Sequence, residues 1–168
     1  MTMPPLGEWR DFYVMIGTAS GAIVGATFVV ASLASNIRDR MAEGFRGFIT
    51  PSAVHLASVL VGSAILTAPT LRPLGLTLLL GAGGIAGVIY GIVIAFRVRS
   101  FNLDLADRAF YVALPIAGYA AMAAAAALCR WAGELGFDIL AISLVVLLIA
   151  GMRNAWDMAT FMIMRDKA

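Results

Sequence analysis

Five long apolar runs take up most of this 168-residue chain. They cover residues 12–35, 52–71, 74–96, 109–129 and 135–152, and the last of them can continue as a helix to residue 164. The first four contain no Asp, Glu, Lys or Arg. Each of these four reaches the roughly 18 to 20 residues, at 1.5 Å rise per residue, that a hydrocarbon core of about 30 Å requires. We therefore expect an all-α integral membrane protein, a bundle of five transmembrane helices in which residues 1–168 form a single domain.

The composition indicates that membrane lipid surrounds the chain. Apolar residues make up 61% of it and charged residues 13%, against about a quarter charged in soluble proteins. The net charge of +2 is spread over single loops, so the sequence offers no basic face for nucleic acid. The residues before the first run lack the basic leader and small-residue cleavage site of a signal peptide, so we expect the first run to be a retained helix.

The basic residues predict an orientation. If all five runs span, one side of the membrane holds three Lys and Arg residues and the other side holds nine. The three are Arg10, Arg72 and Arg130; the nine are Arg38, Arg40, Arg46, Arg97, Arg99, Arg108, Arg153, Arg165 and Lys167. Because basic residues in short loops are retained on the cytoplasmic side, the amino terminus is predicted to lie outside and the carboxyl terminus in the cytoplasm. The expected location is a bacterial-type inner (plasma) membrane.

The connection between the first two runs carries its own pattern. Apolar residues at helical spacing predict a short helix lying in the membrane interface. They are Ile37, Met41, Phe45 and Phe48. Thr50 followed by Pro51 is typical of a cap and a first-turn proline, which predicts that the second transmembrane helix begins there.

Small residues recur every four positions in two of the runs. The first run carries Gly17, Gly21 and Gly25, and the third carries Gly83, Gly87 and Gly91. Such stripes let helix backbones approach closely, which matters in lipid because close packing replaces the hydrophobic force between helices. The fourth run is also thin, with alanine at most positions from 120 to 127. These faces could all be used inside one protomer; we favour a homo-oligomer in which some of them meet a neighbouring copy.

Polar side chains are few, and five of them are predicted to lie in one layer near the cytoplasmic face. His55 and Tyr90 lie within the second and third runs, and Arg153, Asn154 and Asp157 follow the fifth. Arg153 and Asp157 are four residues apart, the spacing at which opposite charges pair on one helix face. Ionisable residues at membrane depth are costly and usually functional.

Two interpretations of this layer stay open. In one, His55, Tyr90, Asn154 and the Arg153–Asp157 pair line a vestibule or ion site, where the histidine can titrate near neutral pH. In the other, His55 is an interfacial residue, and Arg153 extends to the headgroups while Asp157 neutralises it.

Deeper in the membrane the chain offers only hydroxyl groups, which in membrane helices usually bond to their own backbone. They belong to Thr27, Ser58, Ser63, Thr67, Thr77, Tyr119 and Ser143. The single histidine and the single cysteine, Cys129, cannot supply a multi-residue metal or haem site, so no metal or cofactor is expected. No paired acid and base or nucleophile constellation stands out either, and we expect no enzymatic activity.

Two functional expectations remain. The first is a homo-oligomeric channel or transporter that uses the polar layer near the cytoplasmic face. The alternative is an accessory or assembly subunit, without chemistry of its own, that docks onto other membrane subunits through the same small-residue stripes.

Overall fold

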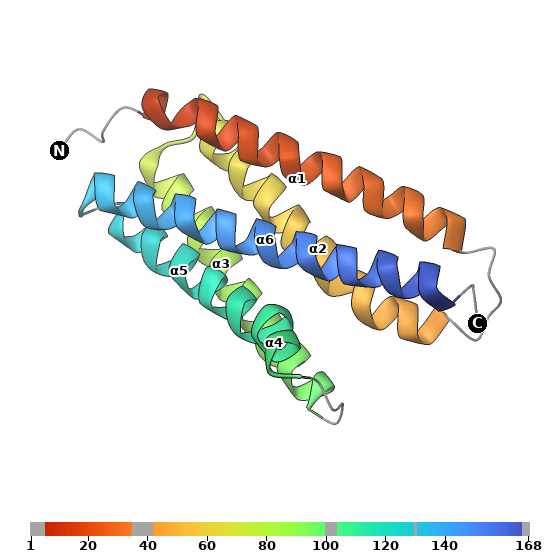
Figure 1. Ribbon diagram of the computed structural model, residues 1–168. Helices are drawn as coiled ribbons and strands as arrows, with labels where there is room; N and C mark the ends of the chain where they lie inside the picture. Colours follow the sequence, from red (N-terminus) through yellow and green to blue (C-terminus); the bar gives the residue numbers. More distant parts are fainter. Residues whose placement is uncertain (1–5, 35–41, 100–103, 130, 166–168) are drawn as a thin grey trace.

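The computed structural model describes residues 6–34, 42–99, 104–129 and 131–165 (Figure 1). Every regular element in these ranges is helical, which confirms the all-α prediction. The elements are α1 (Leu6–Ala34), α2 (Ala42–Thr67), α3 (Pro73–Val98), α4 (Leu105–Arg108), the π-helical segment η2 (Ala109–Ala113), α5 (Leu114–Leu128) and α6 (Gly133–Arg165). The predicted interfacial residues Ile37 and Met41 lie outside the described residues.

Four helical stretches are long and apolar enough to cross a membrane, which is typical of a membrane protein. They are Trp9–Val30, Pro73–Val98, Leu105–Leu128 and Gly133–Asp157. The apolar part of α2, Pro51–Thr67, is shorter. Large apolar side chains cover the outside of the bundle as well as its core; Phe28, Leu78, Ile89 and Ile142 are each more than half exposed. An apolar exterior of this kind suits contact with lipid.

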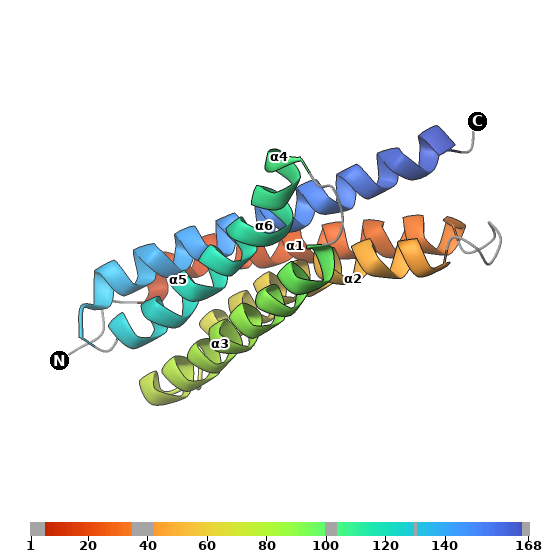
Figure 2. The same ribbon diagram turned by 90° about the horizontal axis from the view of Figure 1, so that it is seen from below.

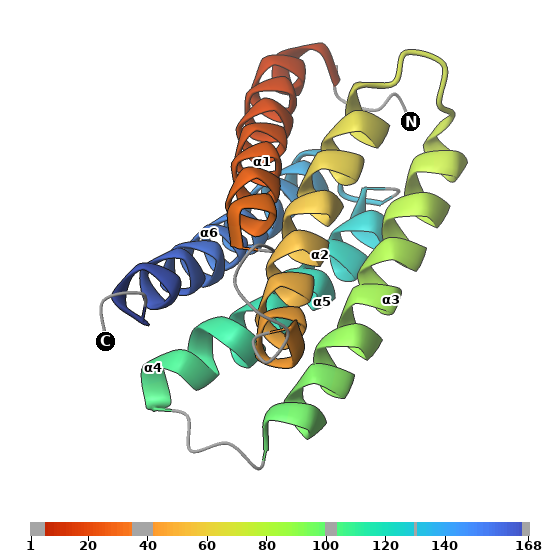
Figure 3. The same ribbon diagram turned by 90° about the vertical axis from the view of Figure 1, so that its right-hand side faces the viewer.

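The helices run alternately up and down, and α6 lies centrally among them. It packs against α5, α2 and α1, whereas α3 packs mainly on α5 and touches α2 much less (Figures 1 and 3). We call one end of the bundle the N-terminal end, because α1 begins there and the α2–α3 and α5–α6 connections lie there. At the opposite, C-terminal end, α1 and α3 finish, α2 and α4 begin, and α6 ends.

The start of α2 differs from the expectation drawn from Thr50 and Pro51. The helix begins at Ala42, ten residues before the predicted run at Ser52, and continues through Pro51. Proline removes one backbone hydrogen bond from a helix, but membrane helices tolerate this because neighbouring helices and side chains satisfy the freed groups. His55 therefore lies about 20 Å along α2 from Ala42 and about 18 Å from Thr67, at 1.5 Å per residue, and is close to the middle of the helix.

Pro115 also shapes the helix that contains α4, η2 and α5. Proline lacks an amide hydrogen and its ring crowds the carbonyl four residues earlier, which disfavours regular α-helical geometry in the preceding turn. The Leu114 N–H instead bonds to the carbonyl of Ala109, five residues back, which is the π-helical spacing. Figure 2 shows the result, in which α4 is turned away from the axis of α5 toward α6.

Glycines make the closest helix contacts. A β-carbon on Gly84 would lie 2.7 Å from the Ala123 backbone nitrogen, and one on Gly91 would lie 2.6 Å from Ile116 Cγ1. Gly17 similarly meets Ser63 Cβ, at 2.9 Å. Gly25, by contrast, faces outward with no atom within 4 Å among the described residues.

Candidate functional site

Polar side chains from four helices gather inside the apolar bundle. We call them the polar cluster: His55 and Ser58 of α2, Tyr90 of α3, Tyr119 of α5 and Asn154 of α6. His55 and Tyr119 are each 1% exposed and Asn154 is 0% exposed, while Ser58 and Tyr90 are half-buried. Burying polar groups among apolar side chains costs free energy unless they form hydrogen bonds, so their partners decide what the cluster can do.

Three members of the cluster form a chain of hydrogen bonds between α2 and α5. His55 Nδ1 lies 3.0 Å from Tyr119 Oη. The Tyr119 hydroxyl donates to Ser58 Oγ at 3.0 Å, and the Ser58 hydroxyl donates to the Val54 carbonyl at 2.8 Å.

The direction of this chain determines which nitrogen of His55 carries a hydrogen. Because the Ser58 hydrogen points to Val54 and the Tyr119 hydrogen points to Ser58, the Tyr119 oxygen is left as an acceptor. His55 Nδ1 must then be the donor, and in the neutral ring Nε2 holds the free lone pair. The network thus fixes the ring and leaves one basic nitrogen available.

Tyr90 of α3 packs its ring against the His55 ring. The rings of His55 and Tyr90 are 6.3 Å apart between centroids and meet edge to face at 75°. The Tyr90 hydroxyl is buried and has no hydrogen-bond partner among the residues that the structure describes.

Asn154 is the least satisfied residue of the cluster. Both its amide nitrogen and its amide oxygen are buried without a partner in the described part of the chain. Asn154 follows Gly151 by three residues, so the two share one face of α6. A β-carbon on Gly151 would lie 2.9 Å from Leu56 Cγ and 3.5 Å from His55 Cβ. Gly151 therefore lets α6 approach α2 beside His55, with Asn154 one turn nearer the C-terminal end.

Glycine also explains how Tyr119 fits into the cluster. Gly87 of α3 faces the Tyr119 ring so closely that a β-carbon there would overlap it. The position is buried, and a larger residue would push the ring away from His55. The α3–α5 contact thus holds the hydroxyl that orients the histidine.

The charged pair predicted beside the cluster lies at its edge. Arg153 Nε is 3.5 Å from an Asp157 carboxylate oxygen, and the two side chains are 40% and 36% exposed. The Arg153 guanidinium also lies 4.3 Å from the centre of the Phe110 ring, an arrangement that allows a cation–π interaction. This pair faces the η2 segment and the surface of the bundle, whereas Asn154 faces the interior.

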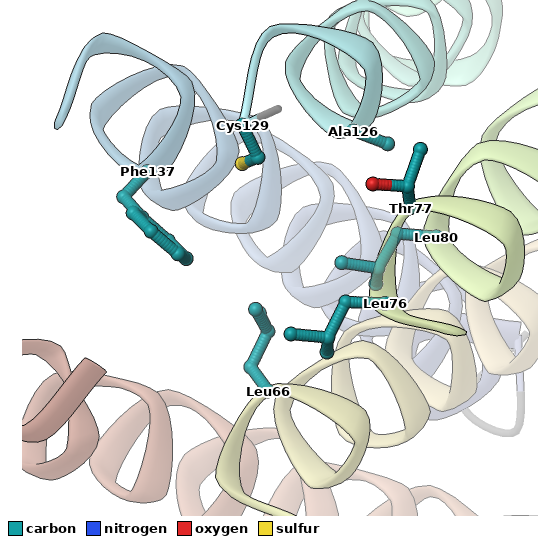
Figure 4. Close-up of a pocket in the computed structure, with 7 residues that line it drawn as sticks. All are labelled: Leu66, Leu76, Thr77, Leu80, Ala126, Cys129 and Phe137. Carbon is teal, nitrogen blue, oxygen red and sulfur yellow. The ribbon is translucent and has the colours of Figure 1, made fainter. Parts of the chain in front are cut away.

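Toward the N-terminal end, apolar side chains close the bundle. Val59, Leu140, Leu144 and Leu147 are all 0% exposed. Beyond them lies a small pocket whose lining is almost entirely apolar (Figure 4). It is lined by Leu66, Leu76, Thr77, Leu80, Ala126, Cys129 and Phe137. The polar cluster therefore has apolar packing on one side and the C-terminal end of the bundle on the other.

The sequence grouped His55, Tyr90 and Asn154 in one layer, and the structure places these three in the interior around α2. It missed the contribution of Tyr119, which bonds across helices rather than to its own backbone. The expectation that hydroxyl groups bond to the backbone of their own helix is confirmed at Ser58 and Ser143, which donate to carbonyls of α2 and α6. In the sequence, Gly87 and Gly151 are the residues that could have indicated close helix packing around Tyr119 and His55.

Within the described residues no group of three or more His, Cys, Asp and Glu side chains could hold a metal ion. Comparison of the chain with models of known protein families, with curated proteins and with solved structures finds no match.

Proposed function

We propose that the protein crosses the membrane five times, with its amino terminus outside and its carboxyl terminus in the cytoplasm. Support for the fifth span comes from α2, which is helical over 26 residues, about 39 Å at 1.5 Å per residue. Its apolar part packs against both α1 and α6, so it belongs to the same bundle as the four longer apolar helices. An odd number of spans also keeps nine of the twelve basic residues on one side.

Within this arrangement the protein acts as a small channel or transporter in a plasma membrane. The observation that carries this proposal is the polar cluster, above all Asn154, which is fully buried and has no hydrogen-bond partner among the residues that the structure describes. Unpaired polar groups destabilise a bundle packed in lipid, and residues of this kind usually mark substrate or ion pathways. Under the proposed orientation the cluster lies in the half of the bundle that is nearer the cytoplasm.

The working unit is proposed to be a homo-oligomer. An alanine stripe runs from the last residue of η2 along α5, with every member exposed: Ala113, Ala117, Ala120, Ala124 and Ala127. The members alternate four and three residues apart, which is the heptad spacing of helices that pack along their length. Because alanine lets backbones approach closely, this face suits a second helix better than it suits disordered lipid tails.

One observation favours the alternative, an accessory subunit without transport activity. The fully buried Val59, Leu140 and Leu144 leave no continuous polar path through the described part of one protomer. A subunit that only docks onto a larger membrane complex would not need such a path, and its small-residue faces would serve assembly.

The oligomeric state and the electrical activity of the purified chain separate these two functions. We expect a homo-oligomer in nanodiscs, measured by mass photometry, and current across planar bilayers that contain it. A matched variant, Ala120→Leu, should weaken assembly and current together, because leucine prevents close approach along the stripe. A monomer that is electrically silent, recovered from membranes with a stoichiometric partner, would instead establish the accessory role.

A further inference from the structure

The polar cluster contains the single histidine of the chain. Imidazole is the side chain that gains and loses a proton most readily near neutral pH. We propose that His55 binds a proton at Nε2, and that water reaches this atom from the C-terminal end of the bundle past Asn154. That the transported species is the proton is a further consequence, and it rests on the transport function proposed above. The proton-binding site at His55 does not depend on that function.

The hydrogen-bond chain prepares the ring for this step. Its direction places a hydrogen on Nδ1 and leaves the lone pair on Nε2. In the binding step a hydronium ion gives its proton to Nε2, an N–H bond forms, a water molecule is released and the ring becomes imidazolium. Nδ1 still donates to Tyr119 afterwards, so none of the three hydrogen bonds has to reverse.

Asn154 supplies the means of bringing water to the site. A carboxamide offers two donor hydrogens and one acceptor oxygen, and none of these has a partner in the described residues. Buried groups left in this state are commonly satisfied by internal water. Gly151 lies beside His55, and Asn154 is three residues further along α6, about 4.5 Å nearer the C-terminal end. A water held by Asn154 would thus stand between His55 and the aqueous phase at that end.

The groups around His55 are compatible with one added positive charge. Tyr90 faces it from α3, Tyr119 from α5 and Gly151 from α6. On the α1 side, the Ser20 hydroxyl donates to the carbonyl of Leu56 at 2.6 Å. These neighbours are uncharged, and the charged side chains of α6 in this region, Arg153 and Asp157, pair with each other. Imidazole is the one basic side chain of the cluster, so it is the member that takes up the proton.

Nitrogen NMR tests the binding site without any assumption about transport. Because the chain has one histidine, protein labelled with ¹⁵N-histidine reports on His55 alone. As the pH is lowered from about 8 to about 4, we expect Nε2 to titrate reversibly while Nδ1 keeps its hydrogen throughout. Asn154→Leu should slow hydrogen exchange at Nε2. The proposal is overturned if neither nitrogen titrates, if Nδ1 is the atom that titrates, or if Asn154→Leu leaves the exchange unchanged.

Proton uptake into liposomes that enclose a pH-sensitive dye tests the transport consequence. We expect His55→Gln to reduce uptake to the level of protein-free liposomes, and Asn154→Leu to reduce it by about tenfold, the change that corresponds to one lost hydrogen bond in the path. Ser143→Ala is the matched control, because Ser143 is equally buried on α6 but bonds only to Leu140. Potassium or chloride flux that is indifferent to His55→Gln would refute the proton as the transported species and leave the transport function standing. Absence of any ion flux would refute both.

Discussion

Gly87→Ala is the most direct perturbation of the contact that positions Tyr119. A β-carbon at residue 87 would overlap the Tyr119 ring. The matched control is Gly83→Ala, one turn earlier on α3, where the new β-carbon would lie 3.6 Å from Met122 Cε, an ordinary van der Waals distance. The two glycines are equivalent members of one sequence stripe, but in the structure one is buried and the other exposed.

The expected magnitude follows from comparing the two variants with each other. Alanine is favoured over glycine in a helix by about 1 kcal/mol, and both variants gain this contribution. Only Gly87→Ala also overpacks the interior, which typically costs about 1–3 kcal/mol. The free energy of unfolding should therefore be about 1–3 kcal/mol lower for Gly87→Ala than for Gly83→Ala, with Gly83→Ala at or slightly above the wild type.

Reversible unfolding in mixed micelles, followed by circular dichroism, measures this difference. The ¹⁵N signals of His55 provide a second readout, because displacement of the Tyr119 ring should change the environment of Nδ1 only in Gly87→Ala. Equal stability of the two variants, together with identical His55 spectra, would show that the α3–α5 contact does not hold the cluster.

Further substitutions test other contacts. Tyr119→Phe leaves His55 Nδ1 without its partner and should lower the free energy of unfolding by about 1–3 kcal/mol in the same assay; a change below about 0.5 kcal/mol would mean that the bond adds nothing. Asp157→Asn breaks a pair that is more than a third exposed, so a loss of less than about 1 kcal/mol is expected, and a larger one would indicate a buried role. Gly91→Leu should lower the melting temperature in detergent and disrupt assembly, since even a β-carbon would lie 2.6 Å from Ile116 Cγ1; an unchanged melting temperature would contradict the close contact.

Helix positions were largely predictable from the sequence because the signal is local. A run of apolar residues is enough to identify α1, α3, α6 and the helix that contains α4, η2 and α5 as long apolar helices. The start of α2 was not predictable in this way. Residues 42–51 include Glu43 and Arg46 and end in a proline, so hydropathy marks a boundary there, while the backbone continues as one helix.

The cluster was only partly predictable because it depends on register between helices. Hydropathy placed His55 and Asn154 at similar depths, which follows from counting residues along each helix. The partner of His55 is Tyr119, 64 positions away in the chain, and their contact depends on how closely α3 packs on α5 and α6 packs on α2. That closeness comes from Gly84, Gly87 and Gly151. The regular four-residue spacing of glycines predicted that Gly83 would lie at a helix contact, but the buried glycine is Gly84. The spacing alone does not show which face of α3 is buried, because the neighbouring helices determine it.

The energetic balance of the cluster favours a functional role over a structural one. A bundle in lipid gains stability from close packing, and the glycine contacts and the buried leucines already supply it. Hydrogen bonds contribute only about 0.5–1.5 kcal/mol each, whereas an unpaired buried group costs about 1–3 kcal/mol. The three bonds of the histidine chain can therefore offset their own burial, whereas the amide of Asn154 and the hydroxyl of Tyr90 have no such bond to any residue that the structure describes. Apolar residues of similar shape would make a more stable bundle at those two positions, and the water or proton site proposed above is consistent with polar groups being kept there.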